Sequence, residues 1–177
     1  MCHLRGEKRY DNIIRIGVFI LILFAVSACS STNQLSEEEY FEEVFKAQFV
    51  LIDHANAIDD AVDISMEMQK SPLLDFTNTE EFNELLDREG VSENIEKTKQ
   101  ELEEAINALD NPPEKYEYLY QLLMKMSDDV DEYRQLALNP NSDYISYLEE
   151  IRDILKILDE YSVILSSAIG EEIRLNN

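Results

Sequence analysis

The residues in this sequence best suited to holding metal ions are its carboxylates and one histidine. The chain has 38 aspartates and glutamates, and His54 is the only histidine besides His3 near the start. Helical proteins that hold paired metal ions use inward-facing glutamates and Glu-x-x-His pairs. Leu51 stands where that glutamate would be. His54 directly precedes the apolar-stripe residue Ala55, so we expect a histidine at the rim of a core and no metal site.

A calcium-binding loop is the second metal site to consider. Asn139, Asn141, Asp143 and Glu150 match positions 1, 3, 5 and 12 of an EF-hand loop. Such a loop turns sharply at its sixth position and needs glycine there, but the sequence has Tyr144. The sequence therefore favours a turn followed by a helix cap over a calcium site.

The motifs that activate a nucleophile or cradle a phosphate are missing from the sequence. It has no Gly-x-Ser-x-Gly elbow, no glycine-rich phosphate loop and no cysteine–histidine pair suited to nucleophilic catalysis. Carboxylate pairs are frequent, as chance predicts in so acidic a chain. We expect no enzyme activity and no cofactor. Two alternatives stay open: loose cation binding by the acidic residues of 37–43 and 59–63, and an enzyme of unfamiliar type with a polar cluster among its helices.

Aromatic side chains could form a binding surface, and most of the nine tyrosines lie between residues 116 and 161. Some fall on the apolar stripes described below, where we expect core positions with the hydroxyl at the rim: Tyr116, Tyr133 and Tyr144. Others fall off the stripes and are candidates for an exposed surface that binds peptide or glycan: Tyr118, Tyr120 and Tyr147.

The first 28 residues differ in composition from the rest of the chain. Basic residues dominate residues 1–15, and the run 16–26 that follows has no charged side chain. A helix that crosses a bilayer needs about 20 apolar residues. A shorter apolar run between a basic stretch and small residues is typical of a secretory signal peptide. We therefore expect residues 1–28 to be a signal peptide that is removed.

The apolar run leads into Val26-Ser27-Ala28-Cys29, an aliphatic residue and two small residues before a cysteine. This tetrapeptide resembles the lipobox of bacterial lipoproteins. The resemblance implies cleavage between Ala28 and Cys29 by the lipoprotein signal peptidase, and a diacylglycerol thioether on Cys29. The only other cysteine, Cys2, lies in the segment expected to be removed, so no intrachain disulfide would remain.

The strong acidity of the chain limits its partners. Its formal net charge is −23, and removal of the basic leader would make it more negative. Nucleic-acid binding depends on basic side chains that neutralise phosphates, so we expect no nucleic-acid partner. Anionic lipid headgroups would also repel the chain. We expect a membrane contact through the lipid alone, and a protein partner that is basic or is contacted through an apolar face.

The rest of the chain has the three- and four-residue apolar spacing of amphipathic helices, after a polar tether over residues 29–35. A capping box of Ser36 and Glu39 begins the first helix, and Ser71-Pro72 ends it. Residues 79–109 form one kinked helix or two. The apolar stripe expected to face the core in the first helix is widened by three residues: Phe45, Ile52 and Met66.

Two more helices follow a proline-containing turn at residues 111–114. Asn141 or Ser142 is expected to cap the last one, which ends at Gly170 before a frayed tail over residues 171–177. The expected core stripe of the first of these two helices is Tyr116, Leu119, Leu123, Met126, Val130, Tyr133 and Ala137. That of the last is Tyr144, Leu148, Ile151, Leu155, Leu158, Ser162, Leu165 and Ile169. Aspartate in place of Leu123 or Leu155 is therefore expected to unfold the chain.

These elements predict an all-α fold, an antiparallel bundle of three to four long helices over residues 36–170. A parallel coiled-coil oligomer is the alternative, but prolines in the connections favour a chain that folds back on itself. The acidic helical part, residues 36–169, resembles small all-helical extracytoplasmic lipoproteins of Gram-positive bacteria, a loose group largely without assigned function. We expect an interaction module anchored on the extracytoplasmic face of the cell membrane, with a small-ligand- or cation-binding lipoprotein as the alternative.

Overall fold

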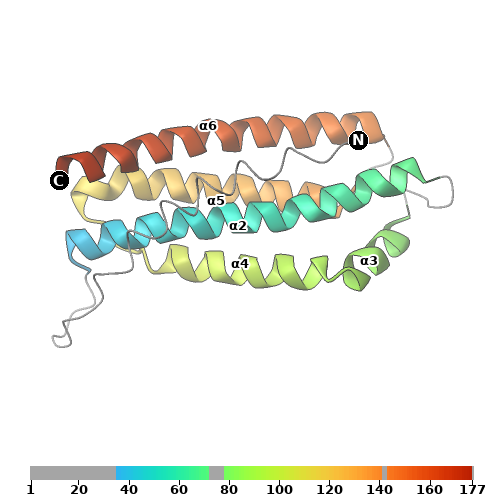
Figure 1. Ribbon diagram of the computed structural model, residues 1–177, viewed down its shortest axis with the longest axis horizontal. Helices are drawn as coiled ribbons and strands as arrows, with labels where there is room; N and C mark the ends of the chain where they lie inside the picture. The colour runs from blue at the N-terminus through green and yellow to red at the C-terminus, as the bar shows by residue number, and fades with distance from the viewer. Residues whose placement is uncertain (1–34, 72–77, 141–142, 177) are drawn as a thin grey trace, which may run out of the picture. The chain divides into compact units, whose positions relative to one another are not determined.

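The computed structural model describes residues 35–71, 78–140 and 143–176, and in these ranges the chain is all-α, with no strand (Figure 1). The expected all-α fold is therefore confirmed. The predicted signal peptide and Val26, Ser27, Ala28 and Cys29 lie outside the described residues. No helix within the described ranges combines the length and apolar character that a bilayer crossing needs.

Helix α2 spans Glu37–Lys70 and begins with the predicted capping box. The backbone N–H of Glu39 donates to the Ser36 hydroxyl at 3.2 Å, and the Glu39 carboxylate accepts from the Ser36 N–H at 2.9 Å. Each contact satisfies a backbone donor that a helix start would otherwise leave unpaired. The helix ends before Ser71, whose extended backbone breaks the helical repeat.

The segment between residues 79 and 109 forms two helices, α3 (Thr79–Arg88) and α4 (Val91–Asn107). Gly90 separates them with a positive φ of 74°, a conformation that costs glycine less than any other residue. The Asn78 side chain caps α3 by accepting from the backbone N–H of Glu81 at 3.3 Å.

The turn with two prolines leads through a 3-10 turn, η1 (Glu114–Tyr116), into helix α5 (Glu117–Leu138). The predicted core stripe of this helix is confirmed at each position, because all seven residues are buried: Tyr116, Leu119, Leu123, Met126, Val130, Tyr133 and Ala137.

Helix α6 spans Tyr144–Asn176, and its predicted end at Gly170 is wrong, whereas the predicted cap residues Asn141 and Ser142 lie outside the described residues. The helix continues through Gly170, so no C-terminal cap forms there and the following residues are helical instead of frayed. Its tail is held to η1, because the Tyr116 hydroxyl donates to Glu172 at 3.1 Å and Lys115 forms an ion pair with the same carboxylate. At its start, Asp143 accepts from the backbone N–H of Ile145 at 3.1 Å and so acts as the cap.

The helices pack in a definite order. Helix α2 packs against α3, α4 and α5, and α5 packs against α2 and α6. Figure 1 shows α4 and α6 on opposite sides of this group, with α2 and α5 between them, and the long helices alternate in direction along the chain. The contacts between α2 and α6 include two side-chain hydrogen bonds, from Gln48 to Ser166 and from Ser65 to Tyr147.

The core face of α6 is rotated from the predicted stripe. Its buried residues are Tyr147, Ile151, Leu158, Leu165 and Ile169, so only part of the prediction is confirmed. Leu155 is 37% exposed, whereas Tyr144, Leu148 and Ser162 are half-buried. The prediction that aspartate at position 155 unfolds the chain therefore loses its basis.

Candidate functional site

The three tyrosines predicted to form an exposed surface do not come together. Tyr118 is 62% exposed. Tyr120 is half-buried, and its hydroxyl donates to Asp110 at 3.5 Å. Tyr147 is fully buried and accepts a hydrogen bond from Ser65, so its predicted exposure is wrong. Tyr118 lies in the first turn of α5 and Tyr147 in the first turn of α6, at opposite ends of an antiparallel pair, so no tyrosine surface forms.

Several buried tyrosines connect helices through their hydroxyls. Tyr40 donates to the backbone carbonyl of Leu109 at 2.9 Å, and Tyr133 donates to the Asp59 carboxylate. Burial raises the pKa of both phenols, so they are neutral donors at physiological pH. Burial also raises the pKa of Asp59, although the hydrogen bond from Tyr133 opposes that shift. These contacts fix α2 against its neighbours and leave no tyrosine hydroxyl poised for chemistry in this group.

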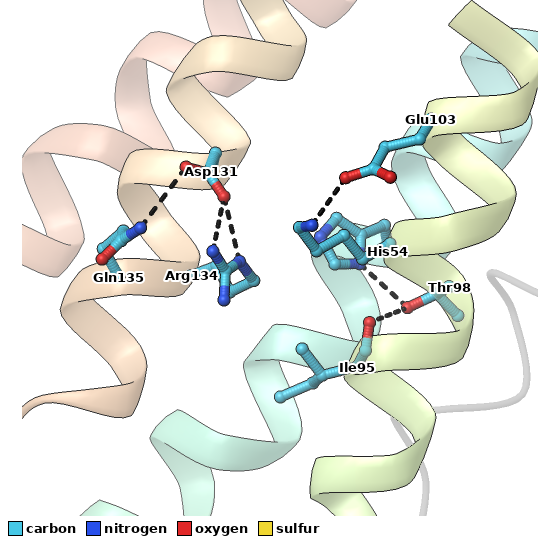
Figure 2. Close-up of polar contacts among 8 residues, drawn as sticks. His54, Ile95, Thr98, Glu103, Asp131, Arg134 and Gln135 are labelled. Atoms are coloured by element: carbon cyan, nitrogen blue, oxygen red, sulfur yellow. Dashed lines mark hydrogen bonds and ion pairs between the residues drawn. The ribbon is translucent and has the colours of Figure 1, made fainter.

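His54 lies inside the bundle instead of at its rim, because α4 covers it: the side chain is 2% exposed. Figure 2 shows it beside Thr98 of α4, with Arg134 and Asp131 of α5 across from them. The Thr98 hydroxyl donates to backbone carbonyls in its own helix, including that of Ile95 at 3.2 Å. It therefore accepts from His54, whose Nδ1 lies 2.9 Å away, and the imidazole carries its proton on Nδ1.

The surroundings of His54 keep its ring neutral. Burial lowers its pKa most, and the positive charge of Arg134 adds to this, whereas Asp131 opposes it. Arg134 is itself engaged, since its Nε and Nη2 donate to Asp131 at 3.0 and 2.8 Å. The ring thus joins α2 to α4 as a neutral hydrogen-bond donor, and nothing in this polar cluster orients it toward a nucleophile.

The described residues contain no group of three or more His, Cys, Asp or Glu side chains arranged to hold a metal ion. In the calcium loop considered from the sequence, Asn141 lies outside the described residues. Asp143 uses its oxygens to accept from Ile145, from the Ser146 N–H and from the Ser146 hydroxyl at 2.8 Å. These hydrogen bonds lower its pKa and make Asp143 a helix cap, the role that the sequence predicted for Asn141 or Ser142.

An exposed apolar surface on α2 lies along its boundary with α6. We call it the α2–α6 seam, and it consists of Phe45, Phe49 and Ile52 on α2 with Val163, Gly170 and Ile173 on α6. Phe49 is 43% exposed and Val163 is 70% exposed. The rings of Phe45 and Phe49 meet edge to face, with centroids 4.8 Å apart. Ile52 was expected to widen the core stripe, but it is 37% exposed at the boundary with α6.

A polar bridge joins the two sides of the seam. The buried Gln48 donates from Nε2 to the exposed Ser166 hydroxyl at 2.9 Å, which ties α2 to α6 beside the apolar side chains. The sequence itself contains a signal for this surface. Residues 161–170 contain no charged side chain in a chain of which 30% is charged.

Comparisons with known proteins return no match: no family model, no curated protein and no solved structure is similar to this chain.

Proposed function

We propose that this protein is a bacterial lipoprotein, anchored through Cys29 on the extracytoplasmic face of the cell membrane, whose helical part is a non-enzymatic interaction module. The observation that carries the proposal is the tetrapeptide Val26-Ser27-Ala28-Cys29 directly after an uncharged run of signal-peptide length. An aliphatic residue and two small residues before a cysteine is the pattern that lipoprotein processing requires.

The charge of the chain indicates that the lipid binds the membrane and that the helical part binds the partner. The full chain has a net charge of −23, and removal of its basic leader makes the remainder more negative, which opposes adhesion of the folded part to anionic headgroups. The lipid therefore supplies the membrane affinity. One acyl chain gives only marginal binding, whereas the diacylglycerol group implied by the motif adds a second chain and stable anchoring. Residues 29–35 then act as a tether that extends at most about 25 Å. The acidic bundle presents its exposed apolar surface to a protein partner from that distance.

Replacement of Cys29 by alanine tests the anchor directly. Without the thiol no thioether forms, so the Cys29→Ala chain is expected to remain uncleaved or to leave the lipid-anchored fraction. Fractionation of intact cells, with the intact mass of the purified chain, measures both results. Cys2→Ala removes the other cysteine and is the matched control, expected to behave as wild type. Unchanged fractionation and mass in Cys29→Ala would refute the lipoprotein assignment.

A further inference from the structure

We propose that the α2–α6 seam binds a basic amphipathic helix of a partner protein. This inference deepens the proposed function, on which it rests, by assigning the surface of the interaction module and the chemistry of its partner. The partner helix would place apolar side chains between α2 and α6 and direct lysines and arginines toward the acidic edges of the seam.

The register of the two helices makes the seam continuous. The bonds Gln48–Ser166 and Ser65–Tyr147 join antiparallel helices, so residues before Ser166 lie level with residues after Gln48. Val163 is therefore level with Leu51, one residue from Ile52. By the same register, Gly170 is level with Val44, one residue from Phe45, and its lack of a side chain widens the seam there. At about 1.5 Å per residue, the apolar positions extend for about 15 Å, or nearly three turns of a bound helix.

The edges of the seam are acidic, and their carboxylates are available. Glu42 and Asp53 lie on α2 one turn from the seam phenylalanines, and Asp159 lies one turn before Val163 on α6. None of these three forms an ion pair with any described residue. Basic residues near the seam are paired with acidic neighbours: Lys46 with Glu43, Lys156 with Glu160 and Arg174 with Glu171. An apolar strip between unpaired carboxylates is complementary to an amphipathic helix with basic flanks.

This charge pattern distinguishes between the occupants that an apolar surface could have. A second copy of the chain would bring the same acidic edges and a net charge of −23 against the seam. An anionic bilayer would repel it for the same reason. Only a basic partner gains from the unpaired carboxylates while it covers the phenylalanines.

A peptide titration tests the proposal, because the chain contains no tryptophan and a tryptophan in the peptide reports its own burial. The probe is an 18-residue leucine–lysine peptide with leucines at helical spacing and one tryptophan on its apolar face. The full chain is held in phosphatidylcholine nanodiscs, and empty nanodiscs give the background. We expect a saturable blue shift of tryptophan fluorescence. A peptide with glutamate for lysine, and a scrambled peptide of equal composition, should give none.

Matched double variants locate the binding surface. Phe49→Ser with Val163→Ser should weaken peptide binding about tenfold or more, since buried apolar anchors dominate such interfaces. Ile145→Ser with Ile157→Ser removes two exposed apolar side chains of α6 outside the seam, and should change affinity less than about twofold. Circular dichroism of both variants checks that they are folded.

Three results would overturn the proposal. Equal affinity in wild type and the seam variant would mean that the peptide binds elsewhere by charge. Equal binding of the glutamate peptide would remove the role of the acidic edges. Association of the chain with itself, lost in the seam variant, would make a second copy the occupant. Each of these leaves the lipid anchor untested, whereas the Cys29→Ala experiment tests the anchor alone, so the two failures are distinguishable.

Discussion

Helices α5 and α6 lie side by side and use their apolar residues differently. Helix α5 leaves one large apolar side chain exposed, Tyr118, and buries a continuous stripe from Leu119 to Ala137. Helix α6 buries a stripe of its own and still exposes six large apolar residues among those described: Ile145, Leu155, Ile157, Val163, Ile164 and Ile173. The difference lies in what covers each helix.

The neighbours of each helix explain this contrast. Helix α5 lies between α2 and α6, so two partners cover its apolar residues. Helix α6 packs along α5 and meets α2 through polar bridges such as Gln48–Ser166. It therefore has more apolar residues than its described neighbours can cover. Contiguous exposed apolar surface on a protein typically marks an interaction site, so the surplus on α6 is consistent with a binding role.

The largest expected effect comes from placing the same charge on each helix. Leu123→Asp on α5 puts a carboxylate into the core and should cost about 4 kcal/mol or more, enough to unfold a domain of ordinary stability. Leu155→Asp on α6 leaves its carboxylate in contact with water and should change stability by about 1 kcal/mol or less. Thermal melts followed by circular dichroism measure both. Cooperative melting of Leu123→Asp, or unfolding of Leu155→Asp, would contradict the claim that position 123 lies in the core and position 155 is open to solvent.

A smaller expected effect is a pH dependence of stability that comes from His54 of α2, which faces charged residues of α5. Burial, Arg134 of α5 and Lys99 of α4 lower the pKa of His54, while Asp131 and Glu96 raise it, and the net shift is downward. The unfolded chain takes up a proton near pH 6.5 and the folded chain does so only at lower pH. The neutral His54 ring therefore makes its full contribution to the free energy of unfolding above about pH 6.5. This contribution is lost as the pH falls toward the pKa of His54 in the folded chain.

His54→Gln isolates this dependence, because it keeps an N–H donor near Thr98 without a titrating ring. The stability of wild type minus that of the variant should fall between pH 7.5 and pH 5, measured by urea unfolding. Taking the difference is necessary because Asp59 and Asp129, whose pKa values burial raises, act in the opposite direction at low pH. A difference that does not change with pH would show that His54 is not held neutral.

The sequence predicted the parts of the fold that local chemistry determines. The capping box at Ser36 and the stripe of α5 follow from side chains a few residues apart, and both are confirmed. The direction that α6 faces could not be predicted in the same way. Apolar residues occur on several sides of that helix, so both Leu155 and Leu158 fit a helical stripe, and only the position of α5 decides that Leu158 is buried.

Candidate functional residues were harder to predict, because burial by a distant helix leaves no local pattern. His54 was placed at the rim because of its position beside Ala55, but Thr98, 44 residues away, closes over it. The apolar spacing predicts Tyr144 on the stripe and Tyr147 off it, but the buried face of α6 is rotated and contains Tyr147. The uncharged residues 161–170 were visible in the sequence, but only the pairing of α6 with α2 turns them into one side of a seam.

Site-specific photo-crosslinking in intact cells tests the central claim, that the α2–α6 seam is the docking surface of an anchored module, most directly. A photoreactive phenylalanine replaces Val163 in the seam or Ile145 outside it, in the full chain with Cys29 intact. We expect a crosslink from position 163, weak or absent from position 145, to a peptide that is amphipathic and rich in lysine and arginine. A crosslink to a second copy of the chain, to lipid alone, or with equal yield from both positions would contradict it.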